Sequence, residues 1–220
     1  VNKPSTINTK IIAINKYLDF IMRPDCEIKT MKIQKQLFVS EEKEMSVSDY
    51  RKLLKAAGND KIGMIIKTIA STGIRISELK YITVEALNCC KVQIAMKGKN
   101  RIVFFSSELR KQLLLYIKSR NIKQGPVFVT KHGLPIDRSN VWKQMKKLCD
   151  KAGVDETRVF PHNLRHLFAR MFYEEEKEIV RLADVLGHSS INTTRIYTME
   201  TGKKHIEVLD RVAGLLMETT

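Results

Sequence analysis

The chain of 220 residues is long enough for one domain with a sizeable core and a shorter extra segment. Its 43% hydrophobic and 29% charged residues are typical of a folded globular protein, and no stretch approaches the roughly 18 apolar residues of a membrane span. We therefore expect no membrane partner. The four cysteines form no CxxC pair and no cluster with histidine at zinc spacing, so we expect reduced thiols in a cytosolic protein.

Positive charge is concentrated in the middle of the chain. The net charge is +15 at pH 7, and residues 91–170 carry 18 Lys and Arg against 5 Asp and Glu, whereas residues 171–220 carry 6 against 9. A local field of this size attracts polyanions, and DNA or RNA is the first candidate. A basic surface that only keeps the protein in solution is the alternative. At this local density we favour nucleic acid.

Residues 1–45 predict one helix followed by a linker. Apolar residues recur at helical spacing through residues 5–22, and Pro24 ends the pattern. A polar stretch that contains several Lys residues follows to about Glu44. Because a single helix cannot bury its apolar face alone, we expect this segment to be the remainder of a preceding domain.

Residues 46–220 predict a compact domain that is mainly α with a small antiparallel β-sheet. Ser46 and Asp49 resemble a capping box at the start of a helix that Gly58 closes. Alternating apolar residues on both sides of Lys97–Asn100 predict a β-hairpin. Further patterns predict helices at about 61–71, 107–120, 139–152, 162–176, 178–186, 190–198 and 203–217, and a short strand at 127–129.

Four short segments contain residue types that suit phosphate chemistry. The first is TGIRISEL, residues 72–79, in which Gly73 permits a tight turn and Arg75 follows at the start of a new helix. A guanidinium group can pair with a phosphate through two parallel hydrogen bonds. On this segment alone, an Arg that pairs with a carboxylate near the turn is at least as good an interpretation.

The second segment is PHNLRH, residues 161–166. Pro161 suits the start of a helix, and His162 and Arg165 are three residues apart and therefore share one helical face. The imidazole can move protons while the guanidinium holds charge. A surface pair on a solvated face is the alternative. We expect His166 to point to a different face and to be structural.

The third and fourth segments are LGHSS and TTRIYT. Gly187 is typical of a helix end, which would leave His188 in a turn, and Tyr197 lies near the end of the next predicted helix. Taken alone, a His in such a turn is usually structural. A Tyr near a helix end is usually a packing residue whose hydroxyl group is in water.

Together the four segments resemble the tyrosine recombinase, or integrase, family of phages, conjugative transposons and chromosome-dimer resolution systems. The family pattern is an Arg in a TGxRxSEL-like segment, a Lys on a β-hairpin, HxLRH, LGH and a downstream Tyr, and all five occur here in order. His162 lies 26 residues before His188 and 35 before Tyr197, and both separations suit the family. The resemblance covers about residues 46–200. It implies that residues 1–45 are the last helix of a truncated core-binding domain plus the interdomain linker.

The resemblance implies a role for each of these residues. Arg75 and Arg165 would hold the non-bridging oxygens of the scissile phosphate, and Tyr197 would attack phosphorus to form a 3′-phosphotyrosyl bond. Because a free phenol has a pKa near ~10, His162 would act as the general base. His188 would donate a hydrogen bond to the phosphate.

Two further assignments concern Lys97 and Glu78. Lys97 would donate a proton to the leaving 5′-hydroxyl group. The family's turn usually reads Gly-Lys-Gly, whereas this turn reads Met-Lys-Gly-Lys, so Lys99 is an alternative. Glu78 would support the histidine or arginine side chains, and an ordinary helix carboxylate is an equal alternative.

The function that the resemblance implies is site-specific recombination of double-stranded DNA through a Holliday junction. It implies a homotetramer on two DNA duplexes, with a DNA-bending accessory protein as a further partner, in a bacterial or phage-type cytoplasm at the nucleoid. The chemistry needs no metal ion or nucleotide cofactor, and the sequence contains no GxxxxGK[ST] loop. The alternatives are a type IB topoisomerase and a non-catalytic DNA-binding module. The LGH segment with its downstream Tyr favours the recombinase.

The predicted helix at 203–217 is amphipathic. It can pack on its own domain, or it can dock on a neighbouring subunit as the C-terminal segment often does in the family. The sequence leaves both interpretations open.

Overall fold

The computed structural model describes residues 2–33, 44–96, 99–130, 132–197, 206 and 209–213, without the side chains of Met96 and Lys99. The chain forms two compact units, residues Val1–Leu37 and Phe38–Thr220. This boundary at 37/38 lies eight residues before the predicted one at 45/46. The assignment of the first unit to a core-binding domain stays a prediction.

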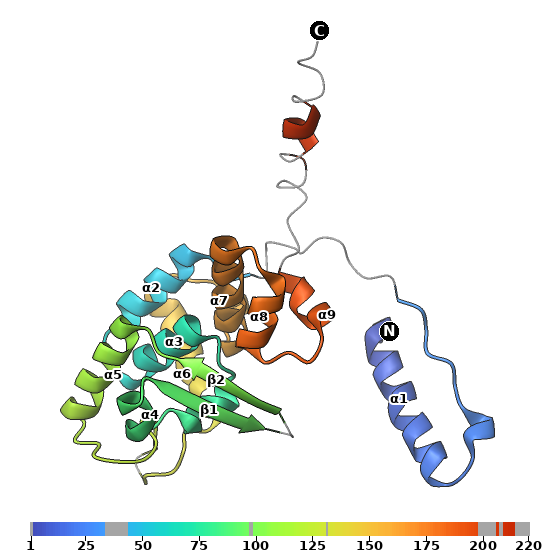
Figure 1. The fold of residues 1–220 in the computed structure, drawn as a ribbon, viewed down its shortest axis with the longest axis horizontal. Coiled ribbons are helices and arrows are strands. Elements are labelled where there is room, and N and C mark those ends of the chain that lie inside the picture. Colours follow the sequence, from blue (N-terminus) through green and yellow to red (C-terminus); the bar gives the residue numbers. More distant parts are fainter. Residues whose placement is uncertain are drawn as a thin grey trace. The chain divides into compact units, whose positions relative to one another are not determined.

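The first unit consists of α1 (Pro4–Phe20), a 3-10 turn (Pro24–Cys26) and an extended segment that returns along the helix (Figure 1). Two asparagines of α1 hold the returning segment. Asn8 bonds both backbone groups of Met31, and Asn15 bonds both backbone groups of Ile28, at 2.8–3.0 Å. No residue of α1 is buried, as expected of a helix without a core of its own.

The second unit is mainly helical with one two-stranded antiparallel sheet, which confirms the predicted fold class. Its described elements are, in order, α2 (Val47–Ala57), α3 (Lys61–Thr72), a 3-10 helix (Ile76–Tyr81), α4 (Val84–Asn88), β1 (Lys91–Met96), β2 (Lys99–Phe104), α5 (Ser107–Ser119), α6 (Arg138–Ala152), a 3-10 turn (Glu156–Arg158), α7 (Pro161–Glu176), α8 (Ile179–Leu186), α9 (Ile191–Thr194) and a last 3-10 turn (Arg195–Tyr197).

Some elements differ from their predictions. The short helix α4 was not expected, and the predicted strand at 127–129 is replaced by an isolated bridge between Val129 and Pro135. The predicted helix at 190–198 ends at Thr194 and continues as a 3-10 turn. Most of the predicted helix at 203–217 lies outside the described residues, although 206 and 209–213 are helical.

Helix α3 lies at the centre of the second unit and contacts α2, α5, α6 and α7. Its residues Ile65, Ile66 and Ile69 are fully buried, because an apolar helix with neighbours on several sides is covered nearly all round. The capping box of Ser46 and Asp49 at the start of α2 is present as predicted. The core therefore anchors the C-terminal end of α3, from which the first of the four motif segments continues.

The inward face of β2 carries Arg101 and Val103. Ile94 pairs with Arg101 in the antiparallel register, and the neighbouring Val103 is buried. The apolar alternation of Ile102 and Phe104 marks the exposed face, where these side chains are 49% and 69% exposed. Since neighbouring strand residues alternate between faces, Arg101 points to the covered side of the hairpin.

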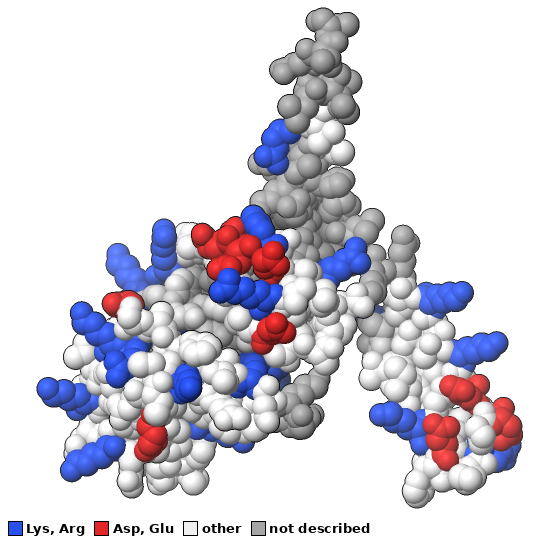
Figure 2. Space-filling view, in the orientation of Figure 1, with Lys and Arg blue, Asp and Glu red and all other residues white. Residues whose placement is uncertain are grey.

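Charge is unevenly distributed over the second unit. On the face drawn in Figure 2, acidic side chains gather where α7 ends in Figure 1, at the exposed residues Glu174–Glu176. Lys and Arg side chains are spread over the rest of that face. None of the described helices is long and apolar enough to cross a membrane.

Candidate functional site

Arg75 lies just after the C-terminal end of α3, and the turn at Gly73 positions it in the site. Gly73 closes the helix in the left-handed region, with φ 63°, and a Cβ atom there would lie 2.4 Å from the ring of Phe168. Only glycine satisfies both conditions. The chain then turns into the 3-10 helix, and Arg75 occupies its N-cap position, close to the predicted place at the start of a helix.

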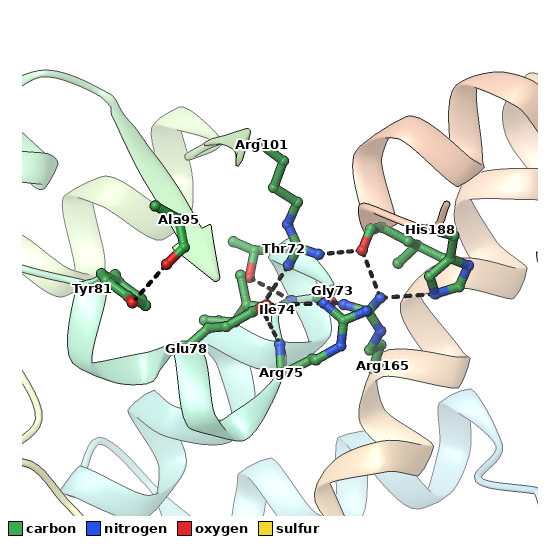
Figure 3. Close-up of polar contacts among 11 residues, drawn as sticks. Thr72, Gly73, Ile74, Arg75, Glu78, Tyr81, Ala95, Arg101, Arg165 and His188 are labelled. Carbon is green, nitrogen blue, oxygen red and sulfur yellow. Dashed lines mark hydrogen bonds and ion pairs between the residues drawn. The ribbon is translucent and has the colours of Figure 1, made fainter. Parts of the chain in front are cut away.

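Glu78 is buried, with 1% of its surface exposed, and its carboxylate accepts hydrogen bonds from two arginines. Oε1 accepts from the guanidinium of Arg75 at 3.0 Å. Oε2 accepts from the backbone N–H of Arg75 at 2.7 Å and from Nη2 of Arg101 at 2.6 Å. These contacts keep a buried carboxylate paired, as burial requires, and they hold the Arg75 side chain against the 3-10 helix (Figure 3).

Arg165 of α7 is the second predicted arginine, and it is buried, with 3% exposed. It donates to the backbone carbonyls of Gly73, after α3, and of Leu186, at the end of α8, and the second bond measures 2.8 Å. A further bond joins its Nη2 to Nε2 of His188 at 3.1 Å. Burial, followed by the positive charge of Arg75, lowers the pKa of Arg165 to about 10. It remains a cation at neutral pH.

His188 follows Gly187, which ends α8 in the left-handed region as predicted. Its Nδ1 atom lies 2.9 Å from Oγ1 of Thr194, a fully buried residue of α9. Burial, followed by the charge of Arg165, lowers the pKa of His188 to about 4. The imidazole is therefore neutral near pH 7.

His162 and His166 contact each other on α7, with their Nε2 atoms 3.0 Å apart. The expectation that His166 points to a different face is wrong, because residues four apart on a helix are neighbours just as residues three apart are. At this distance one nitrogen donates and the other accepts. Burial lowers the pKa of both rings, that of His166 to about 4. Both rings are therefore mainly neutral at pH 7.

Tyr197 lies between two of these histidines. Its ring meets the ring of His166 edge-on, with centroids 4.6 Å apart, and stacks on the ring of His188 at 6.0 Å and 17°. Only 5% of Tyr197 is exposed, and it packs with Leu182 and Leu186 of α8. The structure thus brings Arg75, His162, Arg165, His188 and Tyr197 into one connected cluster, although 122 residues separate the first from the last.

An open cleft of about 1270 Å³ adjoins this cluster. It is bounded by the 3-10 helix, the hairpin and the turn between α8 and α9, and its lining includes Arg75, Glu78, Arg101 and His188. Of the arginines in this region, Arg75 and Arg101 line the cleft, whereas the buried Arg165 does not. Its walls include the exposed apolar side chains of Ile102 and Phe104.

The two candidate lysines cannot be placed. Lys97 lies outside the described residues. Lys99 belongs to β2 and pairs with Met96, but its side chain is not described. The choice between them stays open.

Three residues of the cluster were missed or misplaced by the sequence argument, namely Arg101, His166 and Thr194. An Arg opposite an apolar residue in a hairpin is a usable signal, because Ile94 and Arg101 face the same side. The signal for His166 is its spacing of four residues from His162. We find no sequence signal for Thr194, whose contact with His188 depends on the turn at Gly187. Among the described residues no group of three or more His, Cys, Asp or Glu could hold a metal ion.

The chain is similar in sequence to known proteins. Residues 43–204 match the model of the phage integrase family. Tyrosine recombinase XerH of Campylobacter jejuni is 38% identical over 141 residues, which are 61% of this chain and 40% of that protein. Tyrosine recombinase XerA of Pyrococcus horikoshii is 30% identical over 223 residues, which are 97% of this chain and 75% of that protein.

Solved structures have the same fold. The crystal structure of XerA recombinase superimposes with a TM-score of 0.67 at 24% identity, over 95% of this chain and 76% of the other. XerH site-specific recombinase bound to its palindromic difH substrate, in a post-cleavage complex, gives a TM-score of 0.73 at 21% identity. That match covers 94% of this chain and 65% of the other.

Proposed function

Because the chain belongs to the phage integrase family, that of the tyrosine recombinases, we propose that it is the catalytic part of a site-specific DNA recombinase. Its substrate is double-stranded DNA with a specific recombination site. The observation that carries the proposal is the connected cluster of Arg75, Arg165, His188 and Tyr197 beside an open cleft. This cluster supplies cations for a phosphate and a phenol for attack in one place.

In the first step the phenol oxygen of Tyr197 attacks phosphorus. The new bond joins that oxygen to phosphorus, and the bond from phosphorus to the 5′ oxygen breaks. The DNA 3′ end remains on the protein as a phosphotyrosine, while the 5′ end leaves as a hydroxyl. A 5′-hydroxyl of another strand then reverses the step and rejoins DNA, so the bond energy is kept without a nucleotide cofactor.

Arg75 and Arg165 stabilise the charge that develops on the non-bridging oxygens. Preorganised donors are effective because the protein has already oriented them before the reaction. For Arg165 the assignment is supported by its burial and by its hydrogen bonds to the backbone carbonyls of Gly73 and Leu186, which fix the side chain in place. For Arg75 it is supported by the position of the side chain on the wall of the cleft.

The histidines move or hold protons. His162 accepts the phenol proton, a role that a neutral imidazole can perform near pH 7. The proton of the leaving 5′-hydroxyl comes from Lys97, with Lys99 as the alternative. His188 donates to the phosphate once its Nε2 atom carries a proton.

Residues 1–45 serve as the last helix of a core-binding domain, which helps to hold the DNA duplex, and as the linker to the catalytic domain. Four such subunits act on two duplexes, with a DNA-bending protein as a further partner at the nucleoid. The relatives support the DNA substrate, since XerH is seen with difH DNA. The assembly of four subunits is proposed because each subunit holds its own DNA and exchanges strands with a partner subunit.

The proposal is tested by covalent capture. Cells that express the chain, with any flanking sequence its gene encodes, are lysed under denaturing conditions, and the DNA attached to protein is sequenced. We expect adducts at one discrete sequence, and none with Tyr197→Phe. Equal adducts from the variant would contradict the assignment of the nucleophile. Adducts spread over the genome, with relaxation of supercoils, would instead indicate a topoisomerase.

A further inference from the structure

A third arginine, Arg101 of β2, lies between the two arginines to which the proposed function assigns the phosphate. Its side chain is 9% exposed. Nη2 donates to Oε2 of Glu78 at 2.6 Å, and Nη1 donates to the backbone carbonyl of Leu186 (Figure 3). The hairpin thereby contacts both the 3-10 helix and the end of α8 through a single side chain.

Each acceptor of Arg101 is shared with one of the other two arginines. Glu78 also accepts from Arg75, through its other oxygen, at 3.0 Å. The carbonyl of Leu186 also accepts from Nη2 of Arg165, at 2.8 Å. A continuous network therefore runs from Arg75 through Glu78, Arg101 and Leu186 to Arg165.

This arrangement is costly if it serves stability alone. The Nε atom of Arg101 is buried and has no hydrogen-bond partner among the described residues, and burial lowers the pKa of the side chain. A buried ion pair is weak evidence for stability, because desolvation offsets much of the attraction. A cation that is held here at such a cost needs another explanation.

The turn after α8 is shaped to admit this side chain. A Cβ atom on Gly187 would lie 2.7 Å from Cδ and 2.8 Å from Nη1 of Arg101, and its φ of +65° also favours glycine. Gly187 therefore permits both the helix end and the close approach of Arg101. His188, the next residue, is positioned by the same turn.

The charges also suit the reaction. Three guanidinium groups and one carboxylate leave a net charge of two positive units in this network. A phosphodiester carries one negative charge, and attack by a tyrosinate oxygen adds a second. Arg101 thus completes the charge balance for the transition state, in which the two arginines that contact phosphate would otherwise be partly neutralised by Glu78.

We propose that Arg101 is a positioning residue of the phosphate site, which sets Arg75 and Arg165 relative to each other through Glu78 and Leu186. The inference rests on the proposed function, because it assigns Arg101 to the same phosphate. The guanidinium group of Arg101 is necessary because its several N–H donors reach two acceptors in different directions, Glu78 and the carbonyl of Leu186. A lysine would keep the charge but not this arrangement of donors.

Binding of orthovanadate tests the inference without knowledge of the target DNA. Vanadate is a phosphate analogue that accepts five ligands, and its affinity for the folded chain is measured by ⁵¹V NMR titration. The variants are Arg101→Met and Arg101→Lys. The matched control is Arg110→Met, which removes the same charge from an arginine that also donates to a backbone carbonyl, that of Leu87 at 2.6 Å, but does not line the cleft.

We expect Arg101→Met to weaken vanadate binding by about tenfold or more, as the loss of charge-assisted hydrogen bonds predicts. Arg101→Lys should recover little of this loss, and Arg110→Met should bind as the wild type does. Melting curves select a temperature at which every variant is folded, so a loss of stability alone does not change the dissociation constant. If Arg101→Met is unfolded at every temperature, Arg101→Lys alone decides.

Two outcomes would overturn the inference and leave the proposed function standing. Arg101→Met could bind vanadate as Arg110→Met does, or Arg101→Lys could bind it as the wild type does, in which case only local charge matters. A third outcome would overturn both. In that case the wild type would bind vanadate no better than a variant with Arg75→Ala and Arg165→Ala, and no phosphate site would exist here.

Discussion

Arg165 donates a hydrogen bond from Nη2 to Nε2 of His188 over 3.1 Å, and this contact determines where the imidazole carries its proton. A guanidinium group has no acceptor, so Nε2 must present its lone pair. The ring proton is then on Nδ1, which donates to Oγ1 of Thr194 at 2.9 Å. A phosphate oxygen can only accept, so His188 must gain a proton on Nε2 before it donates to DNA.

Thr194→Val should keep this tautomer but leave its proton without an acceptor. Because Arg165 still donates to Nε2, the ring proton stays on Nδ1, where valine offers no oxygen. We also expect the free energy of unfolding to fall by about 1–3 kcal/mol, because a buried donor is left unpaired. Long-range ¹H–¹⁵N NMR of the imidazole reports the tautomer, and urea denaturation reports the stability.

Thr193→Val is the matched control, because Thr193 is exposed and precedes Thr194 directly. It should leave both measurements close to those of the wild type. A shift of Thr194→Val to the Nε2–H form would contradict the assignment of Nε2 as the acceptor from Arg165, and a stability equal to that of Thr193→Val would contradict the Nδ1 bond to Thr194.

Stability should rise with pH between about pH 5 and 7. Burial lowers the pKa of His162, and those of His166 and His188 to about 4, while an unfolded histidine titrates near 6.5. In this window the unfolded chain therefore binds more protons than the folded chain, so acid favours unfolding. The stabilisation is complete above about pH 6.5 and is lost as the pH falls toward 4.

Urea denaturation at intervals between pH 5 and 7 measures this slope. We expect His188→Gln to reduce it, because one of the titrating groups is removed. A slope that is flat or negative in the wild type would show that these rings are not neutral in the folded state. The window avoids most carboxylates, which titrate below it.

Local signals in the sequence predict the elements of this fold better than the contacts between them. Gly73 and Gly187 mark helix ends correctly, because the left-handed cap is a local requirement. The fold class follows from helical periodicity and one hairpin. The junction of Gly73 with Arg165, 92 residues apart, depends on the packing of α3 against α7 and has no local signal.

The alternation of apolar residues predicts the hairpin but does not tell which face of β2 turns inward. Ile102 and Phe104 line the open cleft, and Arg101 is the residue that pairs with the buried Ile94. His166 was set aside although its spacing from His162 places both on one face. Residues that bind a polar ligand interrupt the usual alternation of apolar and polar residues. Predictions from that alternation are therefore least accurate at such positions.

Gly73→Ala should strongly destabilise the fold. The new Cβ would lie 2.4 Å from the Phe168 ring and 3.1 Å from Leu186, and the residue would keep a φ of +63°. Overpacking and the left-handed backbone together should lower the free energy of unfolding by about 2–4 kcal/mol. Gly153→Ala is the control, because Gly153 has a φ of +60° with no atom within 4 Å of such a Cβ.

The control should therefore show only the backbone cost, about 1 kcal/mol. Urea denaturation of both variants measures the difference between them. Equal losses would mean that the end of α3 is not packed as closely against α7 as the structure has it.

The choice between Lys97 and Lys99 can be made through the leaving group. In DNA whose 5′ bridging oxygen is replaced by sulfur, the leaving group is a thiolate, which needs no proton from a general acid, since a thiol has a pKa near ~8.5. We expect Lys97→Ala to slow cleavage of ordinary DNA by about 10²–10⁴-fold and to cleave the sulfur-containing DNA at nearly the wild-type rate. The DNA sequence is the one that covalent capture recovers.

Lys99→Ala is the matched variant, two residues along the same hairpin. If it only contacts a phosphate, its loss should slow cleavage of both DNAs by the same factor. Rescue by sulfur in Lys99→Ala and not in Lys97→Ala would transfer the role to Lys99. A lysine that acts as the general acid becomes dispensable when the leaving group no longer needs its proton. If sulfur rescues neither variant, the proton for the 5′-hydroxyl therefore comes from a group outside this turn.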